Sequence, residues 1–122
     1  MSRPVVFIVD DQPFICETIA TILKNNYETR MFTSGNEAVQ YMSENKADIV
    51  LLDYEMPNIT GYEVLLFIRS NKLNGKVPVI FLTAETNERM RTEMLERGAA
   101  DYICKPISAA VLNESIRKHL KK

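Results

Sequence analysis

Three continuous runs of apolar residues limit what this chain can fold into more than any other feature. They span residues 5–9 (VVFIV), 48–53 (DIVLLD) and 77–83 (VPVIFLT). Each run is apolar through its centre rather than alternating, which is typical of strands that are buried on both faces. Such strands occur mainly in parallel sheets that carry helices on both sides. The runs therefore predict an α/β fold.

Segments with helical features separate these runs. Pro13 opens the first, where its missing N–H costs nothing, and apolar residues recur at helical spacing as far as about Asn25. Ser34 and Glu37 have the spacing of a capping box. This pair predicts a second helix over residues 34–45.

Three further helices are expected over residues 61–70, 87–97 and 107–122. Thr60 and Glu63 form a second capping box before the first of them. The inner side of the last helix is expected to hold the apolar side chains of Val111, Leu112, Ile116 and Leu120.

Two shorter strands complete the pattern, over residues 27–32 (YETRMF) and 101–105 (DYICK). Five strands then alternate with five helices, and right-handed crossovers leave few possible topologies. A length of 122 residues suits one domain and is too short for two ordinary ones. We therefore expect a single domain over residues 1–122, with a doubly wound, five-stranded parallel sheet.

The composition excludes several classes of function. The net charge of −1 gives no global field that favours nucleic acid or an anionic membrane. The apolar run near the start is too short for a signal peptide, and none approaches the ~20 residues that span a bilayer. Cys16 and Cys104 form no CxxC motif and are interpreted as small apolar side chains in a reducing cytoplasm. His119, the single histidine, is interpreted as a solvated side chain near a helix end.

Polar residues stand where four of the five strands end. Asp10 and Asp11 follow the first strand, Asp53 ends the third, Thr83 ends the fourth and Lys105 ends the fifth. Each alone has an ordinary explanation, such as a helix cap, β-propensity or a solvated lysine. Because the carboxyl ends of parallel strands share one edge, where ligands bind, we expect all five side chains to converge there. The second strand lacks such a residue, which suits an edge position.

Clustered carboxylates without histidine or thiolate indicate a hard cation with oxygen ligands, and Mg²⁺ fits best. Such an ion would offset the repulsion between the adjacent acids Asp10 and Asp11. A carboxylate can also act as a nucleophile and form an aspartyl phosphate. Asp53, on a central strand, is the natural acceptor, with Lys105 supplying positive charge and Thr83 a hydrogen-bond donor.

The sequence closely resembles the receiver domain of two-component response regulators, of the chemotaxis-regulator type. The resemblance covers essentially the whole chain. It rests on the motifs VDDQP (9–13), LLDYEMPNITG (51–61), FLTA (81–84) and GAADYICKP (98–106). It implies a flavodoxin-like (βα)5 fold with strand order 2-1-3-4-5.

The resemblance also implies a set of ligands and a phosphoryl donor. Asp53 is implied to take a phosphoryl group from a partner histidine kinase or phosphotransfer protein, in a reaction that needs Mg²⁺. Asp11 and Asp53 are implied to bind the ion directly, with Asp10 beside them and the backbone carbonyl of Glu55 completing the protein ligands. Lys105 is implied to contact a phosphoryl oxygen.

A second set of residues is implied to carry the signal. Thr83 turns toward the phosphoryl group and Tyr102 moves inward, which changes a surface made of the fourth helix, the fifth strand and the fifth helix. Pro106 matches the family's cis proline. Glu55 and Glu85 are hypothesised to flank the site and tune the access of water to the phosphoaspartate.

Two other functions compete with a phosphorylation switch. A phosphohydrolase with an aspartyl nucleophile usually has its acids two residues apart and a cap domain, whereas the acids here are adjacent. A phosphorylation-independent pseudo-receiver, acting only as a protein-interaction module, usually lacks the acceptor or the lysine, whereas this chain has both Asp53 and Lys105. We expect a cytoplasmic regulator rather than an enzyme. A C-terminal effector domain in a longer parent protein and a phosphorylation-promoted homodimer are further expectations.

Overall fold

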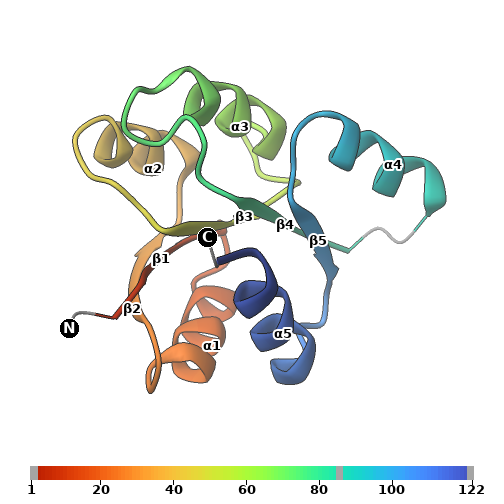
Figure 1. The fold of residues 1–122 in the computed structure, drawn as a ribbon. Coiled ribbons are helices and arrows are strands. Elements are labelled where there is room, and N and C mark those ends of the chain that lie inside the picture. Colours follow the sequence, from red (N-terminus) through yellow and green to blue (C-terminus); the bar gives the residue numbers. More distant parts are fainter. Residues whose placement is uncertain (1–2, 85–86, 121–122) are drawn as a thin grey trace.

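The computed structural model describes residues 3–84 and 87–120, which form one parallel sheet between two layers of helices (Figure 1). The strands are β1 (Val5–Val9), β2 (Glu28–Phe32), β3 (Ile49–Asp53), β4 (Val79–Thr83) and β5 (Asp101–Cys104). The helices are α1 (Pro13–Leu23), α2 (Gly35–Met42), α3 (Gly61–Ser70), α4 (Glu88–Glu96) and α5 (Ala109–Leu120). The order of strands is β2-β1-β3-β4-β5, and every pairing is parallel. The predicted doubly wound, flavodoxin-like fold is confirmed.

Alternation along the three central strands divides the core into two layers. In β1, Phe7 and Val9 pack with α2, α3 and α4, whereas Val6 and Ile8 pack with α1 and α5. β3 and β4 alternate in the same way, and all ten of their residues are buried. Figure 1 shows α1 and α5 on one side of the sheet and the other three helices on the opposite side. Burial on both faces explains why these runs are apolar without a break.

The helix ends follow local sequence signals. Thr60 accepts a hydrogen bond from the N–H of Glu63, whose side chain accepts one from the N–H of Thr60, so this capping box is complete. At α2, Ser34 accepts from the N–H of Glu37 and provides half of the predicted arrangement. Gly98 follows α4 with a φ of 111°, a conformation that favours glycine.

The structure corrects some details. Val111 was placed on the inner side of the last helix, but it is 51% exposed. Leu112 and Ile116, four residues apart, define the buried face, and Val111 lies about 100° from Leu112 around the helix. The interpretation of His119 as solvated is also wrong, because its ring is mostly covered and Nδ1 lies 2.9 Å from the carbonyl oxygen of Ser115.

The structure confirms one further expectation and leaves another outside its described residues. The peptide bond between Lys105 and Pro106 is cis, as the resemblance implied. Glu85, hypothesised to flank the site, lies outside the described residues. No helix within residues 3–84 and 87–120 has the length and hydrophobicity needed to cross a bilayer.

Candidate functional site

Three carboxylates meet at the carboxyl edge of the sheet. One oxygen from each of Asp10, Asp11 and Asp53 lies within 4.8 Å of the others. β1 and β3 are adjacent strands, which brings the residue after β1 next to the last residue of β3. Asp10 is fully buried and Asp53 is 3% exposed, whereas Asp11 is half-buried. The convergence predicted for these three acids is confirmed.

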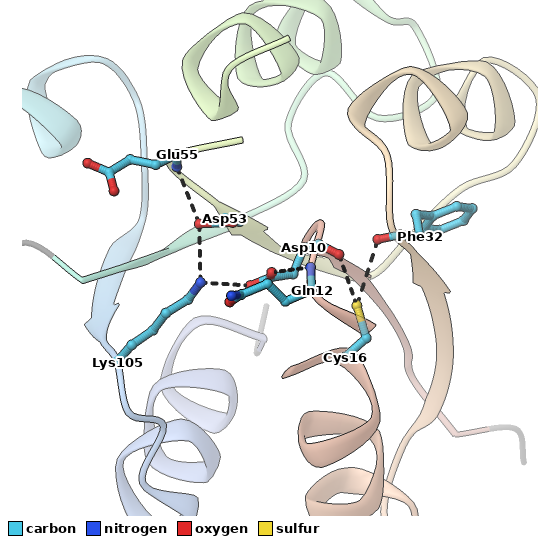
Figure 2. Close-up of polar contacts among 7 residues, drawn as sticks. All are labelled: Asp10, Gln12, Cys16, Phe32, Asp53, Glu55 and Lys105. Atoms are coloured by element: carbon cyan, nitrogen blue, oxygen red, sulfur yellow. Dashed lines mark hydrogen bonds and ion pairs between the residues drawn. The ribbon is translucent and has the colours of Figure 1, made fainter. Parts of the chain in front are cut away.

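Lys105 lies between two of these acids. Its Nζ is 3.0 Å from Oδ2 of Asp10 and 3.4 Å from Oδ1 of Asp53 (Figure 2). The backbone N–H of Lys105 donates to the carbonyl of Thr83, which holds the residue after β5 against the end of β4. The sequence analysis assigned the offsetting charge to a divalent ion. In the structure the Lys105 ammonium also contributes positive charge, beside Asp10 and Asp53.

The two carboxylate oxygens of Asp10 differ in their hydrogen bonds. Oδ1 accepts from the N–H of Gln12 at 2.9 Å, and the backbone carbonyl accepts from Sγ of Cys16 at 3.4 Å (Figure 2). Among the described residues, none donates a hydrogen bond of good geometry to Oδ2, although Lys105 is close. Oδ2 is compensated by the Lys105 ammonium at 3.0 Å, and a further ligand with positive charge would add to this compensation.

The charges of the cluster act strongly on one another. Burial, and after it the charge of Asp10, raises the pKa of Asp53 from its ordinary 3.8 to about 7, although Lys105 acts in the opposite direction. Burial would lower the pKa of Lys105, but its contacts with Asp10 and Asp53 outweigh burial and raise it. Burial, followed by Asp10, raises the pKa of the Cys16 thiol to about 11, which disfavours a reactive thiolate.

The segment after Asp53 is held firmly against its neighbours. The N–H of Tyr54 donates to Leu82, and its carbonyl accepts from the N–H of Gly61. A Cβ at Gly61 would lie 2.4 Å from the backbone oxygen of Asp53, so only glycine allows α3 to begin this close to the end of β3. The N–H of Glu55 donates to Oδ1 of Asp53 at 3.3 Å. The carboxylate of Asp53 is therefore fixed by its own chain.

The remaining predicted residues occupy neighbouring positions. Thr83 is the last residue of β4 and is 1% exposed. Tyr102 lies within β5 and is partly buried against the core. Glu55 is exposed, and its side chain lies away from the carboxylates in Figure 2. The alternative use of Asp11 as a helix cap is not supported, because Gln12 is the N-cap of α1 and makes no side-chain cap.

The residues present fit a hard divalent cation. In the part of the chain that the structure describes, the cluster contains carboxylates alone, and one of its buried oxygens lacks a hydrogen bond. Mg²⁺ prefers oxygen ligands, takes one or two carboxylates and keeps several waters. The half-buried Asp11 leaves one side of the cluster open to solvent. The donor set suits Mg²⁺ better than a metal that prefers nitrogen or sulfur.

Comparisons with known proteins agree with this geometry. The family model of the response regulator receiver domain matches residues 6–117. A Vibrio cholerae protein described as a probable cyclic di-GMP phosphodiesterase is 35% identical over 121 residues, which is 99% of this chain. The chain spans 27% of the length of that relative.

Two solved structures have the same fold. Chemotaxis protein CheY4 of Vibrio cholerae has a TM-score of 0.91 and 26% identity, covering 98% of this chain and all of that one. The receiver domain of a sensor histidine kinase from Pseudomonas aeruginosa has a TM-score of 0.88 and 27% identity, covering 98% of each chain, and holds a magnesium ion in its active-site cleft. On its sequence, its strand order and its acidic cluster, this chain belongs to the response regulator receiver domain family.

Proposed function

We propose that Asp53 accepts a phosphoryl group from a phosphohistidine of a partner kinase or phosphotransfer protein. The observation that carries this proposal is a buried carboxylate that ends a central strand, with the Lys105 ammonium 3.4 Å from its oxygen and two more carboxylates beside it. Phosphoryl transfer depends on positioning and positive charge more than on acid–base groups. The family supports the same role, because receiver domains work with such donors.

The proposed step forms one bond and breaks another. An ionised oxygen of Asp53 attacks phosphorus, the bond between phosphorus and the donor imidazole nitrogen breaks, and the nitrogen keeps the electron pair. The Glu55 N–H, bonded to Oδ1, orients the attacking carboxylate. Lys105 offsets negative charge on the phosphoryl oxygens, and we assign the Thr83 hydroxyl as a hydrogen-bond donor to one of them.

Asp10, Asp11, Asp53 and the backbone carbonyl of Glu55 would hold Mg²⁺ at this edge. When bound, the ion would neutralise developing charge on the phosphoryl oxygens. Its charge would also favour the ionised form of Asp53, whose pKa of about 7 otherwise leaves a large protonated fraction at neutral pH.

We assign Thr83 and Tyr102 as the switch pair. They lie on the neighbouring strands β4 and β5, where Tyr102 pairs with Phe81, two residues before Thr83. Movement of Thr83 toward the phosphoryl group would open space for Tyr102, and the surface of α4, β5 and α5 would change with it. That surface would act on an effector domain in a longer parent protein or form a homodimer. The proposed location is the cytoplasm, where histidine kinases meet such partners.

An intact-mass measurement tests the proposal. The protein is mixed with Mg²⁺ and a small-molecule phosphodonor, and we expect one added phosphate. Asp53→Asn should abolish the uptake, whereas Asp48→Asn, an exposed carboxylate at the opposite edge, should leave it unchanged. Repeated turnover of the donor would instead indicate a hydrolase. An unmodified protein would indicate a pseudo-receiver.

A further inference from the structure

Arg97 connects the end of α4 to residues near the candidate acceptor. It is the C-cap of this helix, and its Nη1 donates to the hydroxyl oxygen of Tyr54 at 3.3 Å. The guanidinium also lies over the ring of Tyr62 in α3, 4.0 Å from the centroid, and pairs with Glu93 at 3.1 Å. One side chain thus contacts α3, α4 and the segment that follows β3.

Tyr54 carries this contact to the acceptor. It directly follows Asp53, and its backbone is bonded to Leu82 and Gly61. Its ring meets Phe81 edge-on, with centroids 4.9 Å apart. Tyr54 also lines an open pocket of about 540 Å³, together with Tyr62 and Arg97. The Tyr54 side chain therefore has two separate contacts, its ring with Phe81 and its hydroxyl with Arg97.

The opposite end of α4 is joined to a different element. Arg91, in the first half of the helix, lies over the ring of Tyr102 in β5, 4.8 Å from its centroid. Only Met94 is buried among the residues of α4, whereas α1, α2, α3 and α5 each bury three or four. A helix with so little buried surface depends on its end contacts for its position.

We infer that Arg97 is a positioning residue, which couples the segment carrying Asp53 to the C-terminal end of α4 and makes this end the fixed end of the helix. The inference deepens the proposed function and rests on it where it concerns switching. When Tyr102 moves inward, Arg91 loses its aromatic partner while Arg97 keeps both of its own. The first half of α4 is then the part that moves, and the helix turns about Arg97.

The link to the acceptor segment is tested first in the free protein, by amide chemical shifts in a two-dimensional NMR spectrum. Arg97→Met should shift the amide of Glu55 at least threefold more than the matched Arg91→Met does. In a Tyr54→Phe background, which lacks the hydroxyl, Arg97→Met should lose most of that effect. Equal shifts from both arginine variants, or an unchanged effect in the Tyr54→Phe background, would overturn the link.

The fixed end is tested with Mg²⁺ and beryllium fluoride, a mimic of the phosphoryl group. In the wild-type protein, amides of residues 88–91 should shift at least threefold more than those of residues 94–97. Arg97→Met should abolish this difference, and Arg97→Lys, which keeps a cation over Tyr62, should restore part of it. A structural role alone would lower stability and leave the difference intact, which overturns the inference.

The two proposals fail in different ways. If beryllium fluoride shifts no amide near Asp53, the proposed function fails and the switching part of the inference is overturned with it, while the free-protein result still decides the link. If the ligand binds and both halves of α4 move equally, the proposed function stands and the fixed end is wrong.

Discussion

Two fully buried polar side chains, Asn74 and Asp10, lie at opposite edges of the same sheet and differ in how completely their polar atoms are hydrogen-bonded. At the amino edge, Asn74 is fully buried, and its side chain accepts from the N–H of Ala47 and donates to the carbonyls of Met42 and Asn45. At the carboxyl edge, Asp10 is equally buried, but one of its oxygens accepts no hydrogen bond within the described part of the chain.

The difference separates a structural clamp from a candidate site. Every polar atom of the Asn74 amide is used to hold three backbone groups in place, so the group has nothing left to bind. At the other edge, burial and then the charge of Asp10 raise the pKa of Asp53, and Oδ2 of Asp10 has the Lys105 ammonium nearby but no hydrogen bond of good geometry from any described residue. Stability favours the first arrangement, whereas the second is worth keeping for a ligand or a reaction.

The largest loss of stability is expected when the hydrogen bonds of Asn74 are removed. Asn74→Ala leaves the N–H of Ala47 and two carbonyls without their partner, and each buried unpaired group costs about 1–3 kcal/mol. Since Asn45, which provides one of the two carbonyls, is only partly buried, we expect a total loss of about 3 kcal/mol in urea unfolding. Asn113→Ala, at a residue whose amide donates to the carbonyl of Ala109 within α5, should change stability by under about 0.5 kcal/mol. A loss below about 1 kcal/mol for Asn74→Ala would break the comparison.

The next effect concerns the lysine within the acidic cluster. Lys105→Met leaves the buried carboxylate of Asp10 without its nearby cation, and breaking a buried pair is strongly destabilising. Because the lysine is 17% exposed, we expect a loss of about 2–3 kcal/mol at pH 8 without Mg²⁺. Lys76→Met, an exposed control, should be nearly neutral. Similar stabilities of the two variants would show that the cluster does not depend on Lys105.

The fold was more predictable than these contacts. Continuous apolar runs and the pairs Ser34–Glu37 and Thr60–Glu63 are local signals, and they predicted the strands and helices of a parallel sheet. The strand order was implied by the resemblance to receiver domains, and the structure confirms it. Carboxylates at strand ends predicted where the acids meet, because parallel strands share one edge. Val111 was misplaced since a single step along a helix turns it by about 100°.

Contacts between residues that are distant in the sequence could not be predicted from local sequence patterns. Asn74 lies 27 positions from Ala47, and Arg97 lies 43 from Tyr54, with no period or motif linking the members of either pair. The position of Lys105 between two acids also depends on packing at the ends of β4 and β5. Residue type and spacing can indicate that such side chains share an edge, but only the packed structure shows which atoms meet.

The third prediction tests the raised pKa of Asp53 through the pH dependence of stability. The folded protein binds this proton with a pKa of about 7, against 3.8 for an ordinary aspartate. As the pH rises from about 4 to about 7 the unfolded chain releases its proton first, so the folded state loses stability over this range. Without Mg²⁺ at pH 8, Asp53→Asn should therefore be more stable than wild type by about 2 kcal/mol. A less stable variant would contradict the raised pKa.

The smallest effect comes from adding the ion. Mg²⁺ that binds only the folded state stabilises it by about 1.4 kcal/mol at ten times its dissociation constant. This gain should be larger at pH 8 than at pH 5.5, because at the lower pH a proton on Asp53, with its pKa of about 7, competes with the ion. Asp11→Asn should lose most of the gain, while Asn74→Ala, though much less stable, should keep it in full. An equal gain in the wild type and in Asp11→Asn would place the bound ion away from the cluster, and both edges of the sheet would then be structural.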